Sequence, residues 1–160
     1  MATAFEQIRE LKQRKEDQAQ TEVRAARLVV EQAARTVEQC RNEAEAFSRQ
    51  LLVRQSSLYD GLEKKKICER SEIDDVREEI ARMRGHEASL YLKIEEAEAA
   101  RIKAVEALEA ARLAHLRSVK NVEKFNQLVS IEQAEAAVLE QAGEDKEMEE
   151  FVRLGEPADA

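Results

Sequence analysis

The stretch from Val23 to Leu51, VRAARLVVEQAARTVEQCRNEAEAFSRQL, decides the fold. Its apolar residues recur at alternating steps of three and four positions, which is the heptad spacing of a coiled coil. We call this row of positions, where one helix would meet another, the seam. The seam comprises Val23, Ala26, Val30, Ala33, Val37, Cys40, Ala44, Phe47, Leu51 and Leu58, with Arg54 as its one polar interruption. The spacing predicts one long amphipathic helix, and Phe5, Ile8 and Leu11 continue an apolar face before it in an offset phase.

The second half of the chain repeats this pattern in two rows of positions. One row is Ile73, Ile80, Glu87, Ile94, Arg101, Leu108, His115, Val122 and Val129. The other row is Val76, Met83, Leu90, Ala97, Ala104, Ala111, Ser118, Phe125, Glu132 and Leu139. Together they predict a second long helix, in which the polar members fix the register at some cost in stability.

The predicted boundaries divide the chain into a hairpin over residues 1–143 and an acidic tail over 144–160, which is partly helical or disordered. Helix one spans about 4–59, the tip 60–71 and helix two about 72–142. Thr3 with Glu6 and Ser71 with Asp74 have the spacing of capping boxes, which open helices. Gly143 is the predicted end of helix two.

A connection as short as the tip favours an antiparallel arrangement of the two helices. The fold class predicted is therefore all-α, a long antiparallel two-helix coiled-coil hairpin. Residue i would lie opposite residue 131 − i, so that Phe5 meets Phe125 or Asn126. Helix two would then extend past helix one by about 12 to 16 residues.

Composition excludes several other classes of protein. Charged residues make up 38% of the chain and aromatic residues 4%, and four glycines are too few for the turns of β folds or the loops of α/β folds. No stretch has the ~18 apolar residues of a membrane span, and Met1 to Arg9 does not resemble a secretory signal. We expect no membrane insertion.

The net charge of −8 is concentrated at one end. Residues 131–160 contain two basic and ten acidic residues, and the remainder is balanced. The chain has no cluster of basic residues, so nucleic acid is not an expected partner. The acidic end is either a partner-binding segment or a solubilising, frayed terminus.

The sequence predicts no enzyme, no cofactor and no metal site. The glycines are isolated, so they form no phosphate-binding loop. Cys40 and Cys68 lack the spacing of a zinc or redox site and are expected to be small, half-buried apolar residues. His86 and His115 have no ligands arranged beside them.

Large apolar residues that a two-helix rod cannot all cover gather near the tip and in the acidic tail. Near the tip they are Leu52, Val53, Leu58, Tyr59 and Leu62, and in the tail they are Met148, Phe151, Val152 and Leu154. If they are exposed, they form docking sites. Alternatively, the tip buries its own leucines, and Met148 and Phe151 fold back onto helix two.

Three stretches carry a family resemblance. They are FEQIRELK at residues 5–12, EKFNQL at 123–128 and DKEMEEF at 145–151. With the two-helix plan, they resemble the small coiled-coil stalk proteins of type III secretion systems, the YscO and FliJ group. The last stretch is similar to the ending of the flagellar members, DQKKMDEF, although its second basic position is acidic here.

The resemblance implies a cytoplasmic protein at the inner face of the secretion apparatus. Its implied partners are the hexameric export ATPase, the export gate protein and export chaperones. By position, the residues implied for gate contact at the tip are Leu52, Leu58, Tyr59, Met83, His86 and Leu90. Those implied for the ATPase end are Phe5, Ile8, Val129, Leu139, Met148 and Phe151.

Three functions are consistent with these observations. The first is an accessory stalk that couples the export ATPase to the gate and chaperones. The second is a generic structural coiled-coil scaffold, and the third is a chaperone-like binder of export substrates. We expect a monomer when the protein is isolated, although the same heptads could serve an intermolecular pair.

Overall fold

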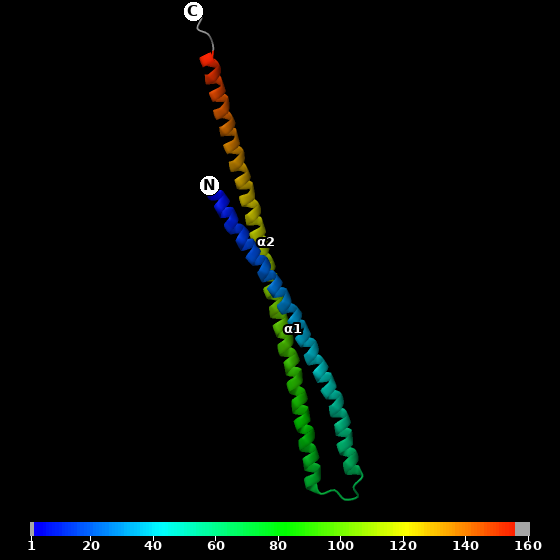
Figure 1. Cartoon of the computed structure of the whole chain (residues 1–160). Coiled ribbons are helices and arrows are strands. Elements are labelled where there is room, and N and C mark those ends of the chain that lie inside the picture. Colours follow the sequence, from blue (N-terminus) through cyan, green and yellow to red (C-terminus); the bar gives the residue numbers. More distant parts are fainter. Residues whose placement is uncertain (1, 156–160) are drawn as a thin grey trace, which may run out of the picture. The chain divides into compact units, whose positions relative to one another are not determined.

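The computed structural model describes residues 2–155, and within that range the chain forms two α-helices and no strand. Helix α1 spans Ala4–Glu63 and helix α2 spans Arg70–Gly155. The chain divides into two units, which we describe separately (Figure 1). The loop-side unit contains residues 23–111, and the terminal unit contains residues 2–22 with 112–155.

The start of α1 confirms the first predicted capping box. The backbone N–H of Glu6 donates to Thr3 Oγ1 at 3.2 Å, and the Thr3 N–H donates to Glu6 Oε2 at 3.1 Å. Two of the helix's free N-terminal donors are thereby satisfied. The start of α2 differs from the prediction, because Ser71 lies inside the first turn and its hydroxyl donates toward the Glu69 carboxylate at 3.5 Å.

Both helices continue past their predicted ends, which were about residue 59 for the first and Gly143 for the second. Helix α1 runs through Gly61 to Glu63, and α2 runs through Gly143 to Gly155. Neither glycine adopts a positive φ. An interior glycine costs a helix only about 1 kcal/mol relative to alanine, and good helix formers flank both positions. Within residues 144–155 the predicted tail is therefore helical, and residues 156–160 lie outside the described range.

In the loop-side unit, α1 and α2 pack side by side and antiparallel on either side of residues 64–69 (Figure 1). The predicted seam is confirmed here. Its most buried members are Val23, Val37, Ala44, Leu51, Ile80, Leu90, Ala97, Ala104 and Leu108. Arg54 and Arg101 are the exceptions, because their side chains are exposed. Glu87 is half-buried in the seam and accepts a hydrogen bond from Ser48 Oγ at 2.9 Å.

In the terminal unit, residues 4–22 of α1 lie beside α2 over a more polar seam. Ala19, Val122 and Val129 are buried, but Lys12, Glu16 and His115 share the seam with them, half-buried. Lys12 Nζ lies over the Phe125 ring, 5.7 Å from its centroid. The predicted apolar face at the N-terminus is wrong at Leu11, which is 55% exposed because the seam passes through Lys12 instead.

The register differs from the prediction by about four residues. Contacts such as Ser48 to Glu87 in the loop-side unit and Thr3 to Glu132 in the terminal unit place residue i opposite about 135 − i. Helix α1 ends four residues later and α2 begins two residues earlier than predicted, so the centre of the hairpin moves along the chain by about one residue. The residue that meets Phe125 is therefore Lys12 and not Phe5.

Candidate protein-binding surfaces

The six residues predicted for the tip do not form one accessible surface. Leu52 and Tyr59 are 65% and 45% exposed, and they lie seven positions apart on one face of α1. Leu58 and Met83 are half-buried in the seam. Leu90 is buried against α1, so it cannot contact a partner while the helices remain packed, and we remove it from the surface.

His86 has a defined neighbour on α1. Its ring meets Phe47 edge to face, with centroids 4.6 Å apart and an interplanar angle of 76°. Its side chain remains exposed beyond this contact. An aromatic pair of this geometry adds about 0.5–1.5 kcal/mol to the packing. We therefore assign His86 a packing role and leave Leu52 and Tyr59 as the accessible part of the predicted tip surface.

A shallow hollow on α1 adjoins the two accessible residues. It is lined by Leu52, Val53, Ser56, Ser57, Asp60, Gly61 and Lys64. Leu52 and Val53 expose 65% and 71% of their surface there. The tip leucines are thus not all folded inward: Leu58 and Leu62 are half-buried, whereas Leu52 remains exposed.

The residues predicted for the ATPase end also divide into two groups. Val129 is 2% exposed and lies inside the seam, so we remove it from the surface. Ile8 is half-buried, and Phe5 is 39% exposed. Leu139, Met148 and Phe151 are 74%, 68% and 78% exposed, because no part of α1 lies opposite them in the described residues.

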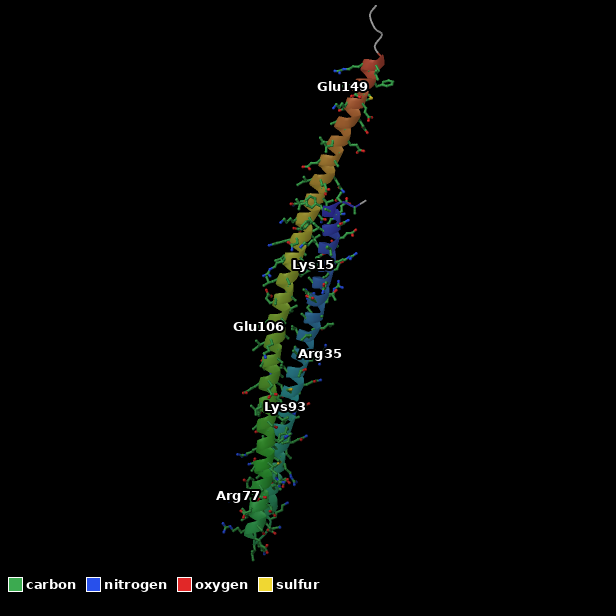
Figure 2. The ribbon with its side chains drawn as sticks, turned by 90° about the vertical axis from the view of Figure 1, so that its left-hand side faces the viewer. Lys15, Arg35, Arg77, Lys93, Glu106 and Glu149 are labelled. Atoms are coloured by element: carbon green, nitrogen blue, oxygen red, sulfur yellow. The ribbon has the colours of Figure 1, made fainter. Side chains whose placement is uncertain are left out.

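We define the extension as residues 133–155, the part of α2 that follows Glu132. The Glu132 carboxylate accepts a hydrogen bond from Thr3 Oγ1 at 3.1 Å, and every residue of the extension is exposed. The orange-to-red part of α2, which contains Glu149, has no second segment beside it (Figures 1 and 2). The structure thus leaves Met148 and Phe151 uncovered, and they do not fold back onto α2.

The sequence reasoning missed a hydrophobic groove in the loop-side unit. Leu28 and Val29 are 63% and 58% exposed. They line the groove together with Gln32, Ala33, Arg35, Thr36, Ala97 and Ala100. The signal was present in the run Leu28-Val29-Val30, since only one of three consecutive residues on a helix can face the seam.

Within residues 2–155, no group of three or more His, Cys, Asp or Glu side chains is placed to hold a metal ion. Cys40 and Cys68 are free and half-buried, as predicted. None of the helical segments described is both apolar and long enough to cross a bilayer.

The pKa of one lysine in the loop, Lys65, is raised above its ordinary value. A hydrogen bond from Lys65 Nζ to Glu72 Oε1, at 3.0 Å, raises the pKa of Lys65, and the negative charge of Glu72 raises it further. This pair connects residues 64–69 to the first turn of α2. It stabilises the loop locally.

Comparison with known proteins identifies the family. A crystal structure of type III secretion protein YscO from Vibrio parahaemolyticus matches with a TM-score of 0.86 and 24% identity, covering 92% of each chain. That similarity confirms the all-α, two-helix hairpin fold. No curated protein matches the sequence.

A family model described as type III secretion protein YscO matches residues 5–154. That family functions in type III secretion and is not a known family of enzymes. Because the match spans nearly the whole described chain, the chain belongs to the YscO family of type III secretion proteins.

Proposed function

We propose that the protein is a cytoplasmic accessory stalk of a type III secretion apparatus. It associates with the hexameric export ATPase at the inner face of the apparatus and couples the ATPase to the export gate and to export chaperones. The observation that carries this proposal is the family match over residues 5–154. Nucleotide chemistry belongs to the ATPase in this proposal, and the present chain contributes contacts.

The distribution of exposed apolar side chains supports the proposal. The loop-side unit presents Leu52 and Tyr59, and the terminal unit presents Met148 and Phe151. Exposed clusters of large apolar residues within polar surroundings are typical of protein-docking surfaces. Two such clusters, one in each unit, suit a component with two different partners.

The remaining surface supports contacts that form and break repeatedly. Its ion pairs are exposed, as for Arg49 with Glu45, whose side chains are 79% and 68% accessible. Exposed ion pairs contribute about 0–1 kcal/mol each. Contacts made by such a surface would therefore rearrange readily during ATP turnover.

The ATPase contact is tested with purified components. The export ATPase of the same secretion system is mixed with the full chain, and both binding and ATP hydrolysis are measured. We expect binding at micromolar concentrations and altered hydrolysis. If neither occurs, the ATPase part of the proposal is wrong.

The gate contact is tested with Leu52→Asp combined with Tyr59→Asp. Both side chains are exposed, so we expect lost binding to the gate protein and unchanged helicity by circular dichroism. Leu113→Asp with Leu116→Asp is the matched control, since these leucines are 48% and 50% exposed and belong to neither surface. Intact gate binding by the first variant would exclude Leu52 and Tyr59 from the contact.

A further inference from the structure

The extension, together with Ile131 just before it, carries a row of apolar residues that α1 does not cover. Ile131, Ala134 and Val138 follow the heptad spacing, and Met148 and Val152 continue the same row. Ile131 lies two residues after the buried Val129, and side chains two residues apart on a helix point about 200° apart. This row therefore faces away from α1.

The exposed fractions of this row are large. Ile131, Val138, Met148 and Val152 are 55%, 67%, 68% and 60% exposed, and Leu139 and Phe151 lie beside them at 74% and 78%. A shallow apolar hollow is lined by Ile131, Ala134, Glu135, Val138 and Leu139, and a second is lined by Met148, Glu149, Val152 and Arg153. Burial of such side chains is favourable by about 25 cal/mol per Å². The extension thus has two apolar contact points separated by Gln141 and Asp145.

The charge of the extension restricts what can bind it. Residues 133–155 contain seven acidic and two basic residues, a net charge of 2 − 7 = −5. A second copy of this segment, a surface of anionic phospholipids and a nucleic acid are all negatively charged, so each would be repelled at short range. A partner that binds this segment stably would therefore carry lysine or arginine beside the apolar residues that contact it.

We propose that the extension is a helical ligand for a protein groove with an apolar floor and a rim of lysine and arginine. The segment is already helical when unbound, so binding requires little ordering of its backbone. The apolar row enters the groove, and Glu147, Glu149 and Glu150 meet the basic rim. This inference rests on the proposed function only in taking the export ATPase as the first partner to test.

The apolar contact is tested with Met148→Gln combined with Phe151→Gln in the full chain. We expect the dissociation constant for the ATPase to rise at least about tenfold, since two exposed apolar anchors are lost. Leu92→Gln with Leu113→Gln is the matched control, because these exposed leucines of α2 lie outside the extension. We expect the control to bind as the unmodified protein does.

The charge contact is tested with Glu147→Gln, Glu149→Gln and Glu150→Gln together. We expect several-fold weaker binding at about 50 mM salt and a smaller difference at about 500 mM, since salt screens exposed charges. Glu95→Gln, Glu106→Gln and Glu109→Gln together form the control, because all three are exposed on α2 in the loop-side unit. Equal affinity and equal salt dependence for the two triple variants would overturn the basic rim.

The outcomes separate this inference from the proposed function. If the unmodified chain binds the ATPase and both extension variants bind equally well, the inference is wrong and the ATPase contact stands. If the unmodified chain does not bind the ATPase, a photoreactive residue replacing Val152 in secreting cells identifies the contact by mass spectrometry. A contact peptide with apolar residues flanked by lysine or arginine supports the inference, and an acidic contact peptide or no crosslink overturns it.

Discussion

The loop-side unit and the terminal unit use the same heptad pattern but fill it differently. In the loop-side unit the seam positions with the least exposure are apolar, as at Val37, Ala44 and Leu51, which are 3%, 1% and 5% exposed. In the terminal unit Glu16, His115 and Glu132 occupy seam positions. Polar residues at such positions specify the register and lower stability. The difference teaches that one repeating pattern can produce helix pairing of unequal strength within a single chain.

The largest expected effect comes from Leu51→Ala in the loop-side unit. The side chain is 5% exposed, so its truncation leaves a cavity in the seam and should lower the free energy of unfolding by about 2–4 kcal/mol. Urea unfolding followed by circular dichroism measures the change. Leu52→Ala is the matched control, since that neighbour is 65% exposed and its truncation should cost less than about 0.5 kcal/mol. Equal losses for the two leucines would mean that the seam does not stabilise this unit.

The next effect, a gain in stability, is expected from Glu16→Leu combined with His115→Leu in the terminal unit. His115 Nε2 lies 3.5 Å from Glu16 Oε1 and is buried without a hydrogen-bond partner. Replacing a buried, poorly satisfied polar pair with apolar residues should stabilise the pairing by about 1–2 kcal/mol.

Hydrogen exchange over residues 4–22 measures that gain, which should appear as slower exchange. Glu22→Leu with Arg112→Leu is the control, because both residues belong to the same unit and are exposed. If the first pair of substitutions accelerated exchange, the polar seam would be the stronger one, and the contrast between the units would be reversed.

The sequence predicted the fold because the heptad spacing depends only on which residues are apolar. The register was wrong by about four residues because it depends on where α1 ends, and Gly61 is tolerated within the helix. The start of α1 was misread because Lys12 lies in the seam with its ammonium over Phe125, which hydrophobic spacing cannot predict.

The accessible surfaces were predicted less well than the fold. Leu90 and Val129 were assigned to partners by position, although their place in the heptad rows already indicated burial. Leu28 and Val29 could not be found from the heptad rows, because both side chains lie on a face of α1 beside the seam. The exposure of Met148 and Phe151 was one of two alternatives left open, because the sequence alone does not decide whether the acidic tail folds back onto helix two.

A smaller effect is expected for the ion pair between Arg41 and Glu98 in the loop-side unit. Arg41 Nη2 contacts Glu98 Oε1, but the side chains are 51% and 34% exposed, so solvent screens the attraction. A double-mutant cycle with Arg41→Ala and Glu98→Ala should give a coupling energy of about 0.2–1 kcal/mol. A coupling comparable to the loss from Leu51→Ala would show that charges, and not apolar packing, hold the loop-side unit together.

The smallest effect concerns the loop, where Lys65 meets Glu72. The pair raises the pKa of Lys65, so its contribution is complete at pH values below the ordinary lysine pKa. It is lost as the pH rises through the higher pKa of the folded chain. NMR titration of Lys65 Nζ should show this raised pKa, and Glu72→Gln should return it toward the ordinary value, whereas Asp75→Asn should leave it unchanged. Because the Lys65 side chain is 55% exposed, amide exchange should change only in residues 64–72 and not in the remainder of the two helices. If exchange changed along the loop-side seam as well, the loop would take part in setting the stability of that unit, and the apolar seam would not be sufficient to explain its difference from the terminal unit.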